Sequence, residues 1–135
     1  MAMAGVTTLS SFAQSGIFGK WKTIGDETGK PKSFVVIYQN EEKEYGKIIS
    51  LFPEPGEDPN PVCEECDDYR KNKEIIGMEI VTGMHKNGDE WVDGEILDPE
   101  NGKVYRCKLW VENGKLKVMG YIAFFYRIQT WLKIG

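Results

Sequence analysis

Three cysteines and one histidine are the side chains in this sequence best suited to chemistry. Cys63 and Cys66 form a Cys-x-x-Cys pair, whereas His85 and Cys107 lie far from it along the chain. Structural zinc needs four such ligands, and a redox-active dithiol needs a nearby positive charge or a helix N-terminus. Because the neighbours of the pair are acidic, we favour a disulfide between Cys63 and Cys66. Zinc binding and redox chemistry are the less favoured alternatives, and Cys107 is expected to be a small buried residue.

The cysteine pair lies in residues 52–73, the single long segment that shows no regular pattern. Long loops of this kind are often functional. This one is rich in proline and carries seven acidic residues, namely Glu54, Glu57, Asp58, Glu64, Glu65, Asp67 and Asp68. Calcium binds to such oxygen ligands, but the spacing of a calcium-binding loop is missing. We therefore expect a solvated acidic loop, and the sequence predicts no metal and no cofactor.

A second acidic stretch, around Asp98 to Gly102, could suggest a metal or acid/base site. Each residue type there already has a role in a turn, because Pro99 fixes φ, Asp98 caps backbone amides, and Asn101 with Gly102 accepts positive φ. His85 stands alone beside a turn sequence, and no Ser-His-Asp or Cys-His arrangement can be assembled. The sequence therefore identifies no catalytic residue.

Strands, rather than helices, are predicted to position these residues. Polar and apolar residues alternate, and Gly, Pro and Asn-Gly turns divide the chain into short segments without sustained helical periodicity. Eight strands are expected, at residues 19–24, 33–38, 44–51, 75–82, 92–97, 103–111, 115–122 and 127–134. Nearly all follow one another through short turns, which is typical of an up-and-down antiparallel sheet. Because closure removes unpaired edges, we predict an all-β barrel of about eight strands, one domain over residues 16–135.

Alternation within the strands predicts the barrel interior. The predicted inward residues are Ile76, Met78, Ile80, Tyr105, Cys107, Leu109, Val111, Leu116, Val118, Gly120 and Ile122. Residues 33–38 are apolar on both sides, so part of the outer surface must be covered. An inward Tyr105 among aliphatic side chains suits a small, mainly apolar or amphipathic ligand with one polar group. The predicted ligand-binding residues are Tyr38, Met78, Ile80, Ile96, Tyr105, Cys107, Leu109 and Val118.

Composition restricts the partners and the location of the protein. The net charge of -4 and pI near 5.1 disfavour nucleic acid as a partner. No apolar run approaches the ~18 residues of a membrane span. Residues 1–15 resemble a signal-peptide remnant or a disordered N-terminus, which predicts a secreted or periplasmic protein. A short helix over residues 9–18 could plug one end of the barrel through Phe12, Ile17 and Phe18.

Two other functions stay open beside ligand binding. The first is an interaction module that docks another protein or forms a homodimer. Its exposed aromatic residues would be Trp110, Tyr121, Phe124 and Phe125. The second is an enzyme acting on a small molecule of the cell envelope, with Arg127 or nearby Tyr and Asp side chains as acid/base or anchor.

Several motifs occur in a fixed order along the chain and carry a family resemblance. They include Gly19-x-Trp21, the segment from Ile96 to Tyr105 that reads ILDPxNGKxY, and Gln129-Thr130-Trp131. From Gly19 onward the sequence resembles the bacterial family called domain of unknown function 2147. The resemblance implies an exported bacterial protein with a lipocalin-like, calycin-type β-barrel, and it implies no established activity.

Lipocalins also begin their first strand with Gly-x-Trp and place a basic residue across that indole. The resemblance therefore implies that Lys133 packs over Trp21. A cation over an aromatic face contributes roughly 0.5–2 kcal/mol, so this pair would latch the two ends of the barrel together.

Overall fold

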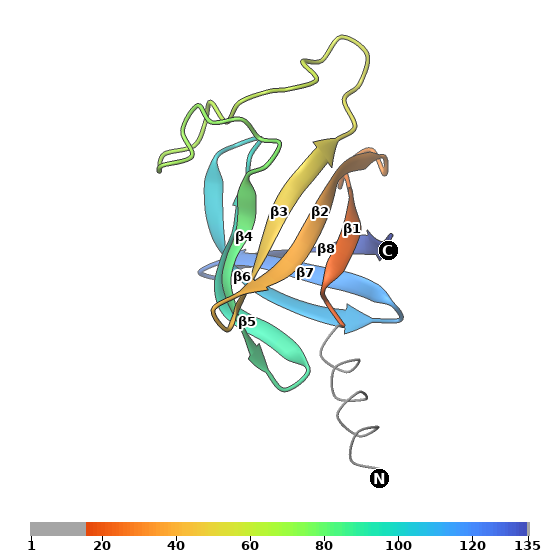
Figure 1. Ribbon diagram of the computed structural model, residues 1–135, viewed down its shortest axis with the longest axis vertical. Helices are drawn as coiled ribbons and strands as arrows, with labels where there is room; N and C mark the ends of the chain where they lie inside the picture. The colour runs from red at the N-terminus through yellow and green to blue at the C-terminus, as the bar shows by residue number, and fades with distance from the viewer. Residues whose placement is uncertain (1–15, 135) are drawn as a thin grey trace.

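A computed structural model describes residues 16–134. It contains eight strands that follow one another around a closed antiparallel barrel, and β1 pairs with β8 to close it. The predicted all-β fold class is therefore confirmed (Figure 1). The strands are β1 (Gly19–Ile24), β2 (Pro31–Asn40), β3 (Lys43–Leu51), β4 (Glu79–Asn87), β5 (Glu90–Asp98), β6 (Lys103–Glu112), β7 (Lys115–Ile122) and β8 (Phe125–Lys133).

The fourth strand differs most from the prediction. It was expected at residues 75–82 but spans Glu79–Asn87, because His85, Lys86 and Asn87 pair with β5 as far as the turn at Gly88. Ile75 precedes the strand, and it is buried by loop packing. Ile76, predicted to face inward, is instead exposed in the loop.

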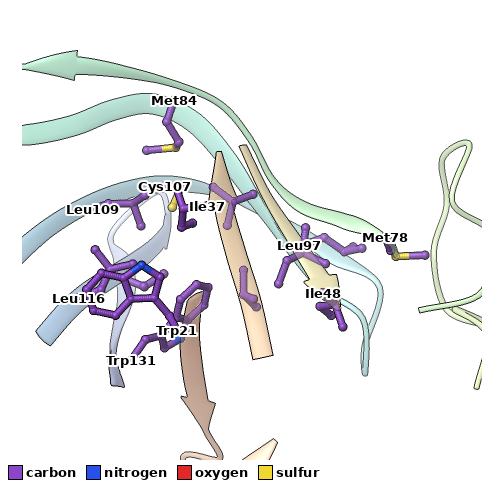
Figure 2. Close-up of a cluster of buried hydrophobic side chains, with 14 of the residues drawn as sticks. Trp21, Ile37, Ile48, Met78, Met84, Leu97, Cys107, Leu109, Leu116 and Trp131 are labelled. Carbon is purple, nitrogen blue, oxygen red and sulfur yellow. The ribbon is translucent and has the colours of Figure 1, made fainter. Parts of the chain in front are cut away.

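Large apolar side chains fill one end of the barrel, which we call the closed half. The turns β2–β3, β4–β5 and β6–β7 lie at this end. Figure 2 shows part of the filling, including Trp21, Ile37, Met84, Leu109 and Leu116, all of them buried. Residues 1–15 lie outside the described part of the chain, and with them most of the helix predicted over residues 9–18. Gly16 to Phe18 is not helical, although Ile17 is fully buried and its carbonyl accepts a hydrogen bond from the Trp21 indole at 2.9 Å.

The connection between β3 and β4, residues 52–78, extends beyond the opposite end of the barrel (Figure 1). A disulfide joins Cys63 and Cys66, and both residues are buried. The loop backbone packs so tightly on the β5–β6 turn that a Cβ on Gly102 would lie 1.9 Å from the Glu65 carbonyl oxygen. This loop therefore covers part of the outer wall, which explains why Leu97 is buried. No helix within residues 16–134 is long and apolar enough to cross a membrane.

Candidate functional site

The candidate site is a cavity of about 710 Å³ in the other half of the barrel, which we call the open half. The connections β1–β2, β3–β4, β5–β6 and β7–β8 lie at this end, because successive antiparallel strands return to it. The apolar part of the cavity wall includes Ile48, Leu51, Ile75, Ile80, Ile96, Val118 and Trp131. Pockets that hold small ligands usually have this size and this mainly apolar lining.

Small and polar residues keep the open half from filling. Thr23 and Ser33 form a pair across β1 and β2, and their hydroxyl oxygens are 2.7 Å apart. Gly120 contributes no side chain beside Tyr105, from which a Cβ there would be 3.4 Å away. All four residues line the cavity. The interior of the barrel is thus left open where the inward residues are small, and a few hydroxyl groups there can form hydrogen bonds with a ligand.

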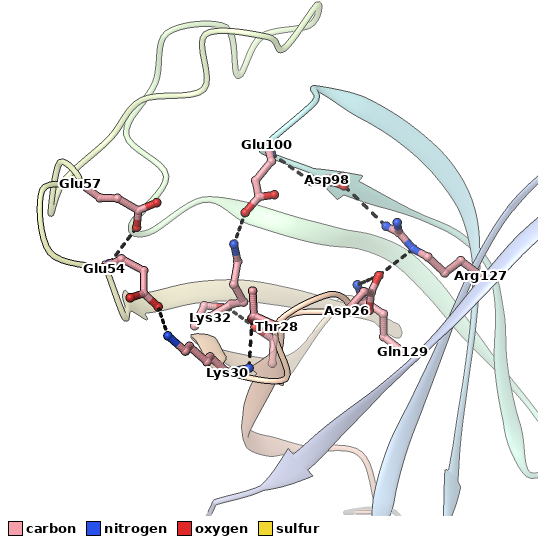
Figure 3. A network of polar contacts seen from close by, with 12 residues as sticks. Asp26, Thr28, Lys30, Lys32, Glu54, Glu57, Asp98, Glu100, Arg127 and Gln129 are labelled. Atoms are coloured by element: carbon pink, nitrogen blue, oxygen red, sulfur yellow. Dashed lines mark hydrogen bonds and ion pairs between the residues drawn. The ribbon is translucent and has the colours of Figure 1, made fainter.

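A network of charged residues surrounds the mouth of the cavity (Figure 3). The guanidinium of Arg127 lies 3.1 Å from Asp26 and 3.6 Å from Asp98. Gln129 donates a hydrogen bond to the Asp26 carboxylate at 3.4 Å and accepts one from the Trp131 indole at 3.1 Å. Alternate residues of β8, namely Arg127, Gln129 and Trp131, therefore face the cavity. The first two are polar, and Trp131 is apolar.

Carboxylates predominate among the charged residues that line the mouth. They are Asp26, Glu27, Glu57, Asp58, Asp98 and Glu100, against the cations Lys32 and Arg127. Lys32 forms an ion pair with Glu100, and the hydrogen bond between them raises the pKa of Lys32 above its usual value. The polar groups are thus concentrated at the rim, whereas the interior is mainly apolar.

Four of the predicted ligand-binding residues line this cavity, namely Ile80, Ile96, Tyr105 and Val118. Three others lie in packed regions away from it. Cys107 and Leu109 are fully buried, and burial raises the pKa of the Cys107 thiol to about 12. Met78 is also buried, beside the long loop. The structure thus places Cys107 and Leu109 in the packed core rather than in the cavity wall.

Tyr38 is the predicted ligand-binding residue that lies on the wrong face of its strand. Ser33, Val35 and Ile37 are the buried residues of β2, so the side chain at 38 alternates to the outside. There it stacks on Tyr45, with ring centroids 6.0 Å apart, and its hydroxyl donates to Glu79. Burial and this hydrogen bond raise the pKa of Tyr38. Tyr38 is therefore an outer-wall residue.

The sequence prediction missed part of the cavity wall. Thr23, Ser33, Gln129 and Trp131 were not predicted, although alternation in β1, β2 and β8 could have identified them. The loop residues Pro61 and Val62 also line the cavity, and no periodic pattern could have placed them. Two predicted interior residues, Val111 and Ile122, are exposed at strand ends.

The structural residues implied by the lipocalin resemblance are in contact. The Lys133 ammonium lies 4.9 Å from the centroid of the Trp21 ring and donates a hydrogen bond to the Phe18 carbonyl at 2.8 Å. Trp21 and Lys133 are also paired between β1 and β8. Over residues 16–134, no three His, Cys, Asp or Glu side chains converge in a way that could hold a metal.

Comparisons with known proteins agree with this architecture. The family model described as "Uncharacterized protein conserved in bacteria (DUF2147)" matches residues 19–133. Among solved structures, the chain is similar to protein HP1028 from the human pathogen Helicobacter pylori, which is described as belonging to the lipocalin family. The sequence identity is 17%, the TM-score is 0.75, and the match covers 88% of this chain and 83% of HP1028. At this identity the likeness establishes the fold alone. No curated protein matches the chain.

Proposed function

Because the chain belongs to the bacterial family DUF2147 and folds as a lipocalin-like barrel, we propose that it is an exported protein that binds a small, mainly apolar molecule. The observation that carries this proposal is the cavity of about 710 Å³ in the open half. A barrel filled by its own side chains would leave no room for a ligand. The lipocalin-like fold itself suggests small-ligand binding, and it supports the same conclusion.

The distribution of polarity favours an amphipathic ligand held in one orientation. The apolar part would lie against Ile96, Val118 and Trp131, because burying apolar surface stabilises the complex by about 25 cal/mol per Å². A polar end would remain near Arg127 and the carboxylates at the mouth, where water is accessible. The hydroxyls of Thr23 and Ser33 would supply further hydrogen bonds.

Export to the periplasm or beyond the cell is part of the proposal. The Cys63–Cys66 disulfide supports it, since disulfides persist mainly in oxidising compartments. Fractionation of the bacterium that carries the native gene, with detection of the protein in each compartment, tests this part. Protein confined to the cytoplasm would contradict it.

A cavity-filling substitution tests ligand binding directly. In Val118→Trp the larger side chain should occupy the cavity, so the fluorescence increase of an uncharged apolar dye such as phenylnaphthylamine should be lost. Val36→Trp is the matched control, because Val36 alternates with the inward residues of β2 and faces outward. Its dye binding should equal that of the wild type. Equal loss in both variants, or wild-type protein that binds no apolar dye, would contradict the proposal.

Docking to another surface is a second candidate function, and exposed aromatic residues favour it. Phe124 is almost fully exposed and Phe125 is largely exposed. Trp110 and Tyr121 are only half-buried on the outer wall. The turn between β7 and β8 is therefore the part of the surface best suited to docking.

A further inference from the structure

The turn between β7 and β8 presents an unusual group of exposed apolar side chains. Phe124 is 96% exposed, Phe125 79% and Tyr126 66%, and the neighbouring Ile122 is 46% exposed. We call these four residues the aromatic tip. No charged residue interrupts the sequence from Ile122 to Tyr126. Contiguous exposed apolar surface of this kind usually marks a site of interaction with a protein or a membrane.

The backbone holds the aromatic tip away from the barrel. Ile122 pairs with Phe125, so Ala123 and Phe124 form a two-residue turn. Ala123 has φ of 53°, in the left-handed region that favours glycine. The closed strand pairing beneath this turn leaves Phe124 at its outermost point. The aromatic side chains are therefore displayed on a rigid hairpin and are not buried by the chain itself.

Positive charges lie on the outer wall directly behind the aromatic tip. One row across the strands places Arg106 of β6 beside Tyr121 and Tyr126. The next row places Lys108 beside Met119 and Ile128 in the same order. On β5, Asp93 lies 3.9 Å from Arg106, Glu90 lies 3.6 Å from Lys108, and Glu95 is the strand-pairing partner of Arg106, so these cations are neutralised. Apolar insertion would thus supply the affinity.

The strand order separates the aromatic tip from the two ends of the acidic loop. In a closed barrel of eight consecutive strands, the β3–β4 connection begins and ends diametrically opposite the β7–β8 turn. The loop between these ends reaches both neighbours of the β7–β8 turn, because Glu54 pairs with Lys30 in the β1–β2 connection and Glu65 packs on Gly102 in the β5–β6 turn. The mouth beside the tip is also acidic, since Asp26 and Asp98 both pair with Arg127. Docking therefore depends on apolar insertion of the uncharged tip and not on attraction by anionic headgroups.

We propose that the aromatic tip docks the protein on the surface of a lipid bilayer. Aromatic side chains on a protruding turn can enter the boundary between headgroups and acyl chains. A second copy of the chain is a less suitable occupant, because stable dimers bury about 1,200–2,000 Å² and a two-residue turn offers little flat surface. Docking would bring the cavity mouth, which Gly120 and Arg127 line next to this turn, close to the lipid. The proposed docking to lipid does not depend on whether the cavity binds a ligand.

Sedimentation with vesicles of equal parts phosphatidylcholine and phosphatidylglycerol tests the proposal. The affinity of the double variant Phe124→Ser, Phe125→Ser for these vesicles should be at least about tenfold lower than that of the wild type, because both apolar side chains are removed. Tyr69→Ser is the matched control, since Tyr69 is an exposed aromatic residue on the opposite loop, and its binding should be unchanged. Both variants should keep the circular dichroism spectrum and dye binding of the wild type, so weaker sedimentation cannot be assigned to unfolding or to loss of the cavity.

A tryptophan at the tip gives a second readout. Added vesicles should shift the emission of Phe124→Trp to shorter wavelength, and acyl-chain bromination should quench it, whereas Tyr69→Trp should respond no more than the wild type. Wild-type protein that remains in the supernatant, or a double variant that binds as the wild type does, would overturn the proposal. So would a concentration-dependent dimer that needs Phe124 and Phe125 without any vesicle binding, because the tip would then serve a second copy of the chain.

Discussion

The closed and open halves of the barrel are built from the same strands, and they differ in the residues that those strands turn inward. In the closed half the inward residues are large, apolar and fully buried, as Trp21, Met84, Leu109 and Leu116 are. In the open half the same strands present Thr23, Tyr105, Gly120 and Gln129. Each strand thus changes from filling the interior to lining a space within a few residues.

This difference indicates how a small barrel can be both stable and hollow. Eight strands enclose an interior that side chains can just fill, so any hollow must be created by small or polar inward residues. The closed half supplies packed apolar contacts, and the open half gives up some of that packing for accessible volume. Stability and ligand binding should therefore respond to substitutions in different halves.

The largest expected effect comes from truncating the closed half. Leu109→Ala should lower the free energy of unfolding by about 3 kcal/mol, because the residue is fully buried and a cavity remains. Ile96→Ala in the open half should cost only about 1 kcal/mol, because Ile96 already borders the existing cavity and little close packing is lost. Urea unfolding of both variants measures the difference. Equal costs would mean that the open half is packed as densely as the closed half.

Two glycines provide a sharper test at the border between the halves. Gly94 and Gly120 both pair with Cys107, one from β5 and one from β7. A Cβ on Gly94 would lie 2.4 Å from both the Met84 sulfur and the Thr82 carbonyl oxygen, whereas on Gly120 its nearest neighbour is 3.4 Å away. Gly94→Ala should therefore cost about 2 kcal/mol through overpacking, and Gly120→Ala should be nearly neutral.

Thermal unfolding of the two alanine variants measures this second prediction. Loss of stability in Gly120→Ala as large as in Gly94→Ala would show that the cavity side of Cys107 is as crowded as its other side. Dye binding by Gly120→Ala should persist, because one methyl group occupies little of the cavity. Both glycines pair with Cys107, so a difference in stability between the two alanine variants would report local packing density and not strand pairing.

Much of the fold could be predicted from the sequence because it depends on local patterns. Turn sequences such as Asn87-Gly88 and Asn113-Gly114 fix where strands end, and short turns between neighbours favour a meander that closes. Alternation correctly placed Cys107, Leu109, Leu116 and Val118 among the buried residues. The fourth strand was misplaced because Ile75 and Met78 are buried by the long loop, which no periodicity reveals.

Less of the candidate site could be predicted, because a cavity depends on what the interior lacks. Tyr38 and Tyr105 are both aromatic residues on strands, yet the first faces outward and the second lines the cavity. Only the register of each strand, set by pairing with its neighbours, distinguishes them. Loop residues such as Pro61 and Val62 enter the wall through tertiary packing of a segment that has no pattern of its own.

The smallest expected effect concerns the contacts of Arg70 with Asp68 and Glu79, which hold the long loop beside the open half and which we call the clasp. Arg70 is buried, and its guanidinium contacts the Asp68 carboxylate at 2.7 Å and the Glu79 carbonyl at 2.8 Å. The hydrogen bond from Arg70 holds the pKa of Asp68 below its usual value. The clasp therefore stabilises the folded protein above the unfolded pKa of about 3.9 and is lost as pH falls through the lower folded pKa.

Asp68→Asn tests this clasp and its confinement to the open half. The variant should be about 1 kcal/mol less stable than the wild type at neutral pH, since Asp68 is partly exposed, and the difference should shrink below about pH 4. Hydrogen exchange should accelerate in residues 52–78 and at the start of β4, while Leu109 and Leu116 keep their protection. Faster exchange at these two closed-half residues would mean that the two halves unfold as one unit. The halves would then differ in the volume that their side chains fill but not in local stability.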